Sequence, residues 1–536
     1  MALPRLATSP AYYSLVGANS FVLGQTAWHY RPGFLSPRAP PKRTFQTSQA
    51  QHEQQTSPPS TSASSTNSSS EHKAEPSISS SSGSNQSLPP GWDDNPDYAI
   101  TNFSQLPHRE FGYNQHIKVN EDFKEALRHI LWQFRAPIRY AVAYGSGVFG
   151  QSGTSKPGDL SPHPNPPKAV EEWQKGGAKV IDFIFGVSHT QHWHSLNLAQ
   201  HPGHYSGLKY LPYASAAISR VQDDFGAGVY FNPFITVNGT MIKYGVVNLD
   251  TLGKDLSDWS TLYLAGRMQK PVKILRDDPR MRLANQVNLI SALRTALLML
   301  PESFTERQLY ERIAGLSYLG DPRMTSFLGM GASENPNKVS NIVGAQLPGF
   351  RQLYVPLIEN LPNVDFTDSR LPKEVAWEKQ DAIRHTGSNP QLDNVLGGES
   401  GLSLNQDMDP VKRGNMVRRL PKAFRRKLYF AYKKKFGIPG SAFSNVLEQS
   451  EDETSDTLRR REGGLFERRI AGESDLPEVM GKCVRATVAW PSTSQTIKSA
   501  FTAGIGRSWK YWSEKRAKGK AKPAASVVVG KEEKKA

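Results

Sequence analysis

Two apolar stretches in the first half of the chain carry residue types that can bind phosphate and a metal ion. One apolar run ends in Tyr144, Gly145 and Ser146, and a second, 180–185, has Asp182 at its centre. Glycine lets the backbone turn sharply and approach a ligand, so main-chain N–H groups and the Ser146 hydroxyl can hold phosphate oxygens. A carboxylate on a neighbouring strand can hold Mg²⁺ against the same phosphates. Together the two motifs predict a nucleoside triphosphate site with Mg²⁺ as cofactor.

Asp182 interrupts an otherwise apolar strand. Alternation places it on one face with Val180 and Ile184, while 181, 183 and 185 occupy the other face. A charge there is costly unless it is paired or bound to a metal. Because a lone Gly-Ser turn is more often only a turn, the prediction depends on both motifs occurring together.

A third candidate is a lysine in a predicted β-hairpin. Residues 229–237 and 240–247 alternate as strands around Asn238-Gly239, a pair typical of a type I′ turn. This register places Lys243 opposite Phe234. Its face would also hold Asn232, Thr236, Met241 and Gly245, and the core face would hold Ile235, Val237, Ile242 and Tyr244. Lys243 is then either a fixed positive charge for phosphate or a solvated strand lysine.

Five of the thirteen histidines lie within 189–204. Imidazole is a common zinc ligand, but this stretch contains no cysteine or carboxylate and its spacing matches no standard zinc motif. We instead predict substrate contacts or capping hydrogen bonds. The residues concerned are His194, Asn197, His204 and Ser206.

The charge balance favours acidic partners. Lysine and arginine outnumber aspartate and glutamate by 65 to 49, a formal net charge of +16, which suits nucleic acid, nucleotides or anionic lipid. The single cysteine, Cys483, excludes an intramolecular disulfide. The longest apolar stretch, 289–300, is too short to span a bilayer and contains Arg294. These features predict a soluble or peripheral membrane protein.

The first 100 residues have the composition of a targeting and linker region. Residues 1–48 contain arginine, serine and threonine but no acidic residue, which is typical of a mitochondrial transit peptide; a merely disordered basic N-terminus is the alternative. Residues 49–100 are dominated by Ser, Gln, Thr, Pro and Asn and are predicted to be disordered.

The remaining pattern predicts an α+β fold in several parts. A domain at 101–274 would begin with a helix over 121–134 and carry a surface insertion at 150–178. A helical, winged-helix-like domain at 275–365 would contain a helix over 283–300 and a second helix opened by a capping box at Ser303 to Glu306. Residues 366–410 are interpreted as a linker or insertion. A basic helical region at 411–490 is either solvated or in contact with an anionic surface.

The segment 491–516 has the pattern of an amphipathic helix. Its apolar residues recur at steps of three and four, with Lys498 and other basic residues beside them. Such a helix can lie in an anionic membrane interface, or it can pack on the protein's own core. Gly504 and Gly506 weaken it in both cases. The membrane-facing candidates are Ile497, Phe501, Ile505, Trp509 and Trp512, and 517–536 is predicted to be a basic disordered tail.

Several of these motifs coincide with those of a known family. The chain resembles the mitochondrial translocator assembly and maintenance family, whose members are peripheral inner-membrane phosphatidate cytidylyltransferases. The resemblance rests on nine ordered stretches, at 143–149, 181–185, 193–197, 204–206, 242–246, 259–272, 300–304, 313–318 and 499–504.

The resemblance implies a nucleotidyltransferase-fold domain, a winged-helix-like domain and a membrane-associating C-terminus. It implies that CTP and phosphatidic acid give CDP-diacylglycerol and pyrophosphate on the matrix face of the mitochondrial inner membrane, upstream of cardiolipin. The partners would be CTP, phosphatidic acid and an anionic lipid surface, with no nucleic acid. Two other hypotheses remain: a nucleotidyltransferase acting on RNA, and a non-enzymatic import or assembly factor of the inner membrane.

In this reading Asp182 and Lys243 are the catalytic residues. Asp182 holds Mg²⁺, Tyr144, Gly145 and Ser146 bind the nucleotide, and Lys243 offsets its charge. Nucleotidyltransferases usually carry a second carboxylate two residues after the first, where this chain has Ile184. Water, triphosphate oxygens or a distant acid such as Asp255 would then have to complete the metal shell.

Overall fold

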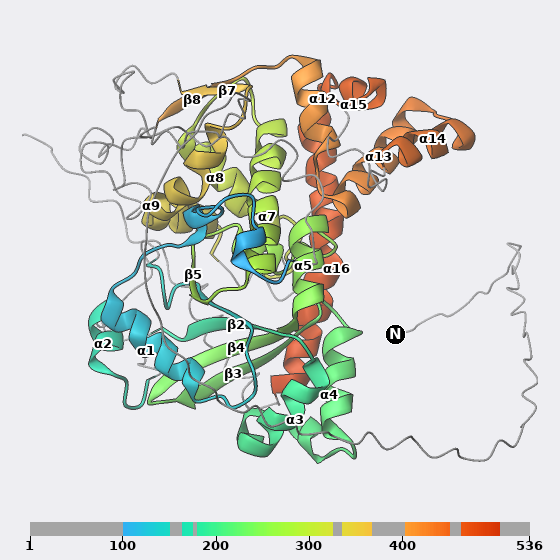
Figure 1. Cartoon of the computed structure of the whole chain (residues 1–536). Helices are drawn as coiled ribbons and strands as arrows, with labels where there is room; N and C mark the ends of the chain where they lie inside the picture. The colour runs from blue at the N-terminus through green and yellow to red at the C-terminus, as the bar shows by residue number, and fades with distance from the viewer. Residues whose placement is uncertain are drawn as a thin grey trace, which may run out of the picture. The chain divides into compact units, whose positions relative to one another are not determined.

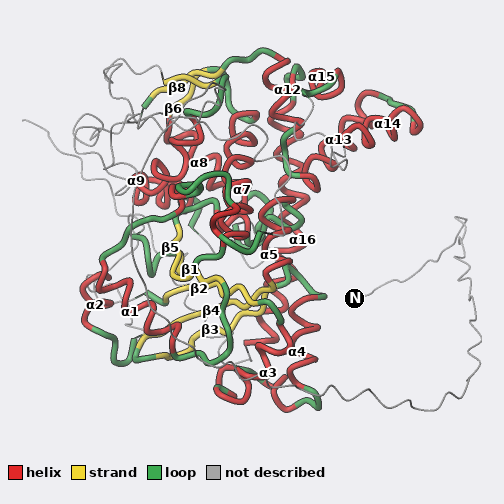
Figure 2. Tube along the Cα trace, in the orientation of Figure 1, coloured by secondary structure: helices red, strands yellow, loops and turns green. Residues whose placement is uncertain are grey.

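A five-stranded mixed sheet holds most of the residues singled out above. The computed structural model describes residues 100–150, 163–174, 179–324, 335–366, 402–450 and 462–503, which form an α+β structure (Figures 1 and 2). The strand order is β3-β4-β2-β1-β5, in which β2 and β4 are parallel and the other neighbours antiparallel. The strands are β1 (Tyr140–Tyr144), β2 (Ile181–Val187), β3 (Val229–Val237), β4 (Thr240–Asn248) and β5 (Val272–Arg276).

Helices cover both faces of this sheet. On one face Val142, Ile184 and Phe231 join the core built around α5 (Leu249–Asp258) and α7 (Pro279–Leu298). On the other, Phe183 and Tyr244 join a second core with α1 (Glu121–Trp132), α2 (Lys168–Gln174) and α3 (Thr190–Gln200). The alternation predicted along β2 is therefore confirmed. Both faces are core because each has its own layer of helices.

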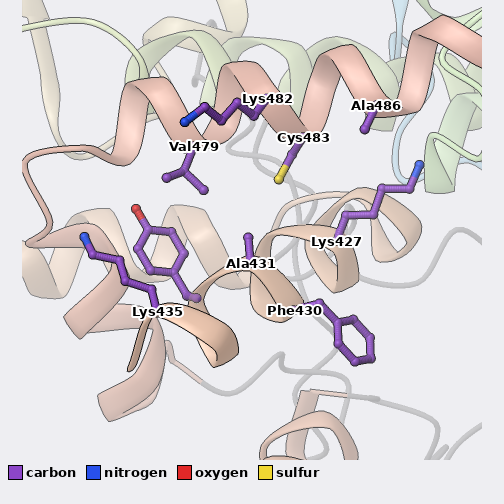
Figure 3. A pocket seen from close by; sticks show the side chains of 9 residues that line it. Lys427, Phe430, Ala431, Lys435, Val479, Lys482, Cys483 and Ala486 are labelled. Atoms are coloured by element: carbon purple, nitrogen blue, oxygen red, sulfur yellow. The ribbon is translucent and has the colours of Figure 1, made fainter. Parts of the chain in front are cut away.

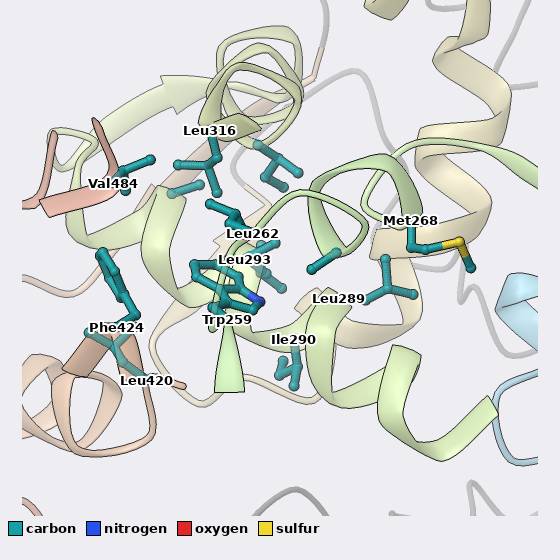
Figure 4. Close-up of a cluster of buried hydrophobic side chains, with 14 of the residues drawn as sticks. Trp259, Leu262, Met268, Leu289, Ile290, Leu293, Leu316, Leu420, Phe424 and Val484 are labelled. Atoms are coloured by element: carbon teal, nitrogen blue, oxygen red, sulfur yellow. The ribbon is translucent and has the colours of Figure 1, made fainter. Parts of the chain in front are cut away.

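The long helix α7 begins earlier than its apolar stripe suggests. Asp278 is the N-cap and accepts hydrogen bonds from the backbone N–H groups of Arg280 and Met281, with Pro279 in the first turn. Almost every side chain of α7 is buried. Trp259 packs against the α7 residue Leu293 in the cluster shown in Figure 4, and its indole N–H donates to Asn288 at 2.9 Å.

A second sheet corrects two sequence predictions. Its strands β6 (Ser303–Thr305), β8 (Ser403–Gln406) and β7 (Val364–Phe366) pair antiparallel in that order. Ser303 is thus a strand residue, and the N-cap of α8 (Glu306–Gly315) is Thr305, which forms a capping box with Gln308. The central strand β8 comes from the stretch interpreted as a linker. Local sequence does not reveal this pairing, because β6 lies about a hundred residues before β8 and β7 about forty residues before it.

The C-terminal part is helical. It comprises α12 (Pro410–Arg418), α13 (Lys422–Phe436), α14 (Gly440–Ser450), α15 (Leu465–Ala471) and α16 (Leu476–Ala503). The remaining elements are η1 (Phe103–Gln105), η2 (Tyr113–Gln115), η3 (Pro202–His204), η4 (Gly207–Tyr210), α4 (Ala214–Asp223), α6 (Ala265–Met268), η5 (Leu316–Tyr318) and α9 (Lys338–Ile358). None of the described helices is long and apolar enough to cross a membrane.

The last helix differs from the amphipathic segment predicted at 491–516. α16 begins at Leu476 and contains Pro491. It runs past α13, η5 and β3 (Figure 1). Lys498 does not lie beside a lipid-facing stripe, because its side chain is buried and its ammonium donates to the backbone carbonyls of Val221, Gln222 and Phe225. This part of α16 is therefore anchored to the end of α4.

An apolar pocket of about 440 Å³ is lined by residues of both α13 and α16 (Figure 3). Phe430 and Ala431 line it from α13 and Cys483 from α16, with Lys427, Lys435 and Lys482 around them. Lys435 pairs with Glu473 and Asp475, and Lys482 with Glu478. The surrounding charges therefore largely compensate one another, and none of the predicted site residues lines the pocket.

Candidate functional site

Three predicted site residues form one row across the sheet. In the strand register Tyr144 pairs with Asp182, and Asp182 pairs with Lys243. The Lys243 ammonium lies 3.7 Å from Asp182 Oδ1, and the two side chains are 19% and 28% exposed. The adjacency expected for the Gly-Ser turn and the Asp strand is therefore confirmed. The row remains partly accessible to a ligand.

Two glycines shape the turn beside this row. Gly145 has a φ of +80°, and a Cβ atom there would lie 3.2 Å from Asp182 Oδ2. A Cβ on Gly147 would lie 2.6 Å from the carbonyl oxygen of Val180. The turn thus presses against the start of β2 as only glycine permits. It brings the backbone at Gly145, the residue before Ser146, close to the Asp182 carboxylate.

Tyr144 connects this row to a second group of residues. Burial raises the pKa of Tyr144 to about 12, and the nearby Asp182 carboxylate adds to the effect. The hydroxyl is therefore protonated near neutral pH. The nearby guanidinium of Arg267 acts on the pKa of Tyr144 in the opposite direction and lowers it. Arg267 is not among the residues predicted from the sequence.

The environment of Lys243 differs from the regular hairpin that the sequence predicts. The turn is of the expected type, with positive φ at Asn238 and Gly239, but the register shifts between Asn232 and Ile235. Proline lacks an N–H for the strand ladder, and Pro233 lies within this irregularity. Asn232 consequently pairs with Tyr244 instead of sharing the face of Lys243.

The ammonium of Lys243 instead lies 4.6 Å from the centre of the Phe231 ring. Phe231 pairs with Gly245 in the register, and a Cβ on Gly245 would lie 2.6 Å from that ring. The aromatic ring covers one side of the lysine. It holds the charge near Asp182, so Lys243 is not a freely solvated strand lysine.

Asp255 is occupied by hydrogen bonds and is unsuited to the metal role considered for it. Its Oδ1 accepts the backbone N–H groups of Thr261 and Leu262, both at 2.8 Å. Its Oδ2 accepts those of Leu264 and Ala265 at 2.9 and 3.0 Å. The side chain is buried. Asp255 therefore shapes the loop that leads into α6.

The predicted histidine and asparagine contacts lie on the opposite face of the sheet. His194 Nε2 donates to Gln222 Oε1 at 2.8 Å, and its Nδ1 accepts from the Tyr205 hydroxyl at 2.9 Å. Asn197 donates to the hydroxyls of Tyr205 and Tyr244. His194 and Asn197 are fully buried. The structure does not bring them to Asp182, and their hydrogen bonds join α3 to the sheet.

His204 and Ser206 lie at the edge of the same region. His204 Nδ1 is 2.8 Å from the Tyr244 hydroxyl, and Ser206 is the half-buried N-cap of η4. Neither is in the row with Asp182. Among the described residues, no three His, Cys, Asp or Glu side chains gather as a metal site.

We expect the stability of the protein to fall between pH 6.5 and pH 4 because of His194. Burial lowers its pKa from 6.5 to about 4, against the hydrogen bond that His194 donates to Gln222, which raises it. In that window the unfolded chain binds a proton that the folded protein does not, so acid favours unfolding. The loss approaches about 3 kcal/mol at pH 4. Urea unfolding at pH 7 and pH 4.5 measures it.

The matched variants for this prediction are His194→Gln and His189→Gln. Glutamine at 194 cannot titrate, so the pH dependence should shrink, whereas the exposed His189 should leave it unchanged. Equal pH dependence in the parent and in His194→Gln would contradict the assignment.

The proposed membrane residues fall mostly beyond the described residues. Ile497 is 42% exposed on α16. The side chain of Phe501 and all of Ile505, Trp509 and Trp512 lie outside the described part. Their membrane role stays a prediction.

Known proteins match this chain in sequence. A family model described as mitochondrial phosphatidate cytidylyltransferase matches residues 127–518. A protein of that name from Schizosaccharomyces pombe is 44% identical over 256 residues, covering 48% of this chain and 58% of the relative. One from Xenopus laevis is 45% identical over 238 residues, covering 44% and 63%. One from Dictyostelium discoideum is 31% identical over 438 residues, covering 79% and 91%. The matches to the yeast and frog proteins thus span about six tenths of those relatives.

Proposed function

The chain belongs to the mitochondrial phosphatidate cytidylyltransferase family, and we propose that it converts CTP and phosphatidic acid to CDP-diacylglycerol and pyrophosphate. The observation that carries the proposal is the row of Tyr144, Asp182 and Lys243 beside the turn at Gly145. The row offers a carboxylate, a fixed ammonium and turn N–H groups within one small region. These are the groups that a triphosphate and its counter-ion require.

The proposed reaction is an in-line displacement. A phosphate oxygen of phosphatidic acid attacks the α-phosphorus of CTP, a new P–O bond forms, and the bond to the β-phosphate breaks with release of pyrophosphate. The attacking phosphate is already ionised near pH 7, so no strong general base is needed. The work of the protein is positioning and charge stabilisation. Gly145 and Ser146 hold the triphosphate, and Lys243 offsets its charge.

The site fits Mg²⁺ through one protein ligand. The Asp182 carboxylate is part-exposed, and Gly145 beside it leaves the space that a Cβ would fill. Carboxylate oxygens suit Mg²⁺, which commonly combines one or two carboxylates with substrate phosphates and water. Bound there, the ion would neutralise charge on the triphosphate. Asp255 is not part of this proposal, because its oxygens are engaged with the α6 loop.

We place the reaction in a nucleotidyltransferase-fold domain at 101–274, joined to a winged-helix-like domain at 275–365. The mixed sheet with its glycine turn supports the first assignment, and α8 with the small β6-β8-β7 sheet supports the second. The basic N-terminus and the relatives' mitochondrial names support import into mitochondria. We propose a peripheral position on the matrix side of the inner membrane, early in cardiolipin synthesis, with no nucleic acid partner.

The activity is tested with the full chain, CTP labelled at the α-phosphate, Mg²⁺ and phosphatidic acid liposomes. Labelled CDP-diacylglycerol should form and should require both the lipid and Mg²⁺. An equal reaction with RNA ends in place of lipid would identify an RNA nucleotidyltransferase. No product from either acceptor would contradict the proposal.

We expect the double variant Trp509→Ser/Trp512→Ser to bind anionic vesicles roughly tenfold more weakly. In the proposed membrane-associating segment 491–516, interfacial tryptophans flanked by basic residues would supply much of the affinity for the vesicle surface. Flotation with vesicles containing phosphatidic acid measures the bound fraction. Trp132→Ser, an exposed tryptophan on α1, is the control. Undiminished flotation of the double variant would count against the membrane role of 491–516.

A further inference from the structure

A group of basic side chains gathers around α6 and η5. Arg267 and Lys270 come from α6 and the turn after it, Arg323 follows η5, and Lys338 begins α9. We call Arg267, Lys270, Arg323 and Lys338 the α6 cation cluster. Gly266 permits the close packing, because a Cβ there would lie 2.3 Å from Ser317 Cβ. α6 and η5 therefore meet closely, with the basic residues of the cluster on α6 and on the segments that follow α6 and η5.

Aromatic rings and hydroxyls hold these cations in place. The Arg267 guanidinium lies 3.9 Å from the centre of the Tyr263 ring. Lys270 donates to Ser317 Oγ at 3.0 Å. The ammonium groups of Lys270 and Lys338 lie 5.2 and 5.3 Å from the centre of the same ring, that of Tyr318. Such contacts fix positive charges without neutralising them.

Positive charge exceeds negative charge among the described residues of this group. Its carboxylate, Asp321, is engaged by Arg323 at 2.9 and 3.1 Å. Burial, together with the neighbouring charges of Arg267 and Lys338, lowers the pKa of Lys270 to about 7, against an opposing effect of Asp321. Like charges held together in a half-buried place are unfavourable unless an anion joins them.

The cluster reaches the proposed active site through Tyr144. Tyr144 lies near enough to Arg267 for the guanidinium to lower the pKa of its hydroxyl, and Tyr144 pairs with Asp182 in the strand register. The Asp182–Lys243 pair is itself electrically neutral. A reaction that brings a triphosphate and a second phosphate together needs more positive charge than this pair supplies.

We propose that the α6 cation cluster is a second anion site, which binds a phosphate or diphosphate group beside the Asp182–Lys243 row. Its role in the reaction rests on the proposed function. The group bound there is either the pyrophosphate end of CTP or the phosphate of phosphatidic acid, since both present the same chemistry. Arg267 and Lys270 make the principal contacts, and Lys338 adds charge across the Tyr318 ring.

Inorganic pyrophosphate is the first probe, titrated calorimetrically into the full chain without CTP or lipid. Lys270→Met and Lys338→Met should each weaken binding roughly tenfold or more, as expected for loss of a charge-assisted contact. Lys254→Met, on the exposed side of α5, is the control and should bind as the parent does. Two variants are used so that a folding defect in one does not decide the result. Equal pyrophosphate affinity in the parent and in both cluster variants would overturn the proposal.

Competition then identifies the natural occupant. Displacement of pyrophosphate by CTP assigns the cluster to the triphosphate, and displacement by vesicles of phosphatidic acid in phosphatidylcholine, but not by phosphatidylcholine alone, assigns it to the lipid. Displacement by neither would overturn a role in substrate binding. Because the pyrophosphate titration involves no turnover, it tests the anion site separately from the proposed cytidylyltransferase activity. If pyrophosphate binding depends on the lysines but no CDP-diacylglycerol forms, the proposed function is contradicted and the anion site is supported. If CDP-diacylglycerol forms but the variants bind pyrophosphate as the parent does, the anion site is contradicted and the proposed function is supported.

Discussion

Asp182→Asn should lower CDP-diacylglycerol formation roughly a hundredfold or more while leaving the protein folded. Asparagine has almost the same shape but no charge, so it cannot hold a cation against the triphosphate. The pairing with Lys243 is also lost. Because that pair is partly exposed, its loss costs at most about 1 kcal/mol of stability. Initial rates with labelled CTP and phosphatidic acid liposomes measure the effect.

The control for this variant is Asp250→Asn. Asp250 is a largely exposed carboxylate on α5 that pairs with Arg280. The Asp250→Asn variant should therefore be as active as the parent. Thermal unfolding of both variants shows whether the fold is intact. If Asp182→Asn is folded and as active as the parent, Asp182 only stabilises the sheet, which is what a non-enzymatic assembly factor would show.

Asp255→Asn should destabilise the protein by about 2 to 4 kcal/mol, because an amide nitrogen would replace one of two oxygens that accept backbone N–H groups. The loop held by Asp255 contains Trp259 and Leu262, both with positive φ near +55° and both buried in the core shown in Figure 4. Non-glycine residues keep such a conformation only where the surroundings impose it. Denaturant unfolding followed by tryptophan fluorescence measures the loss.

The same Asp250→Asn variant is the control here, since it removes a carboxylate from the same helix but only a surface ion pair. Pyrophosphate binding provides a second readout. Asp255 positions Tyr263 and Arg267 without contacting substrate, so the variant should lose affinity for pyrophosphate as well as stability. Stability equal to that of Asp250→Asn would contradict the role of Asp255 in holding the loop.

Local patterns predicted much of the sheet. Alternation placed Asp182 on the face opposite Phe183, and Asn238-Gly239 marked the turn between β3 and β4. These features depend on neighbours within a few residues, where period and turn chemistry act directly. The one-residue shift near Pro233 was not evident, because a bulge depends on how one strand fits its partner.

Contacts between distant segments were not accessible to the same reasoning. Ser303 looked like a helix cap, but pairing with Asn405 makes it a strand residue. Lys498 was predicted to flank the apolar stripe of an amphipathic helix, yet its ammonium donates to backbone carbonyls at the end of α4. His194 was predicted to make substrate contacts or capping hydrogen bonds, and its buried ring joins Gln222 to Tyr205. In each case the residue type was compatible with two environments, and only the tertiary partner distinguished them.

By itself, the sequence determined the family, the Gly-Ser turn, the strand that carries Asp182 and the hairpin that carries Lys243. Each of these was recognised from short motifs of neighbouring residues. The tertiary structure decided which of the candidates meet. It aligned Tyr144, Asp182 and Lys243 in one row and gave Asp255 and His194 structural roles. It also placed Lys270 and Lys338 over the ring of Tyr318 and Arg267 over that of Tyr263. The physical reason is that charge and hydrogen-bond partners are set by distance in space, and Lys270 and Lys338 meet over one ring only because α6 packs against η5, which carries Tyr318.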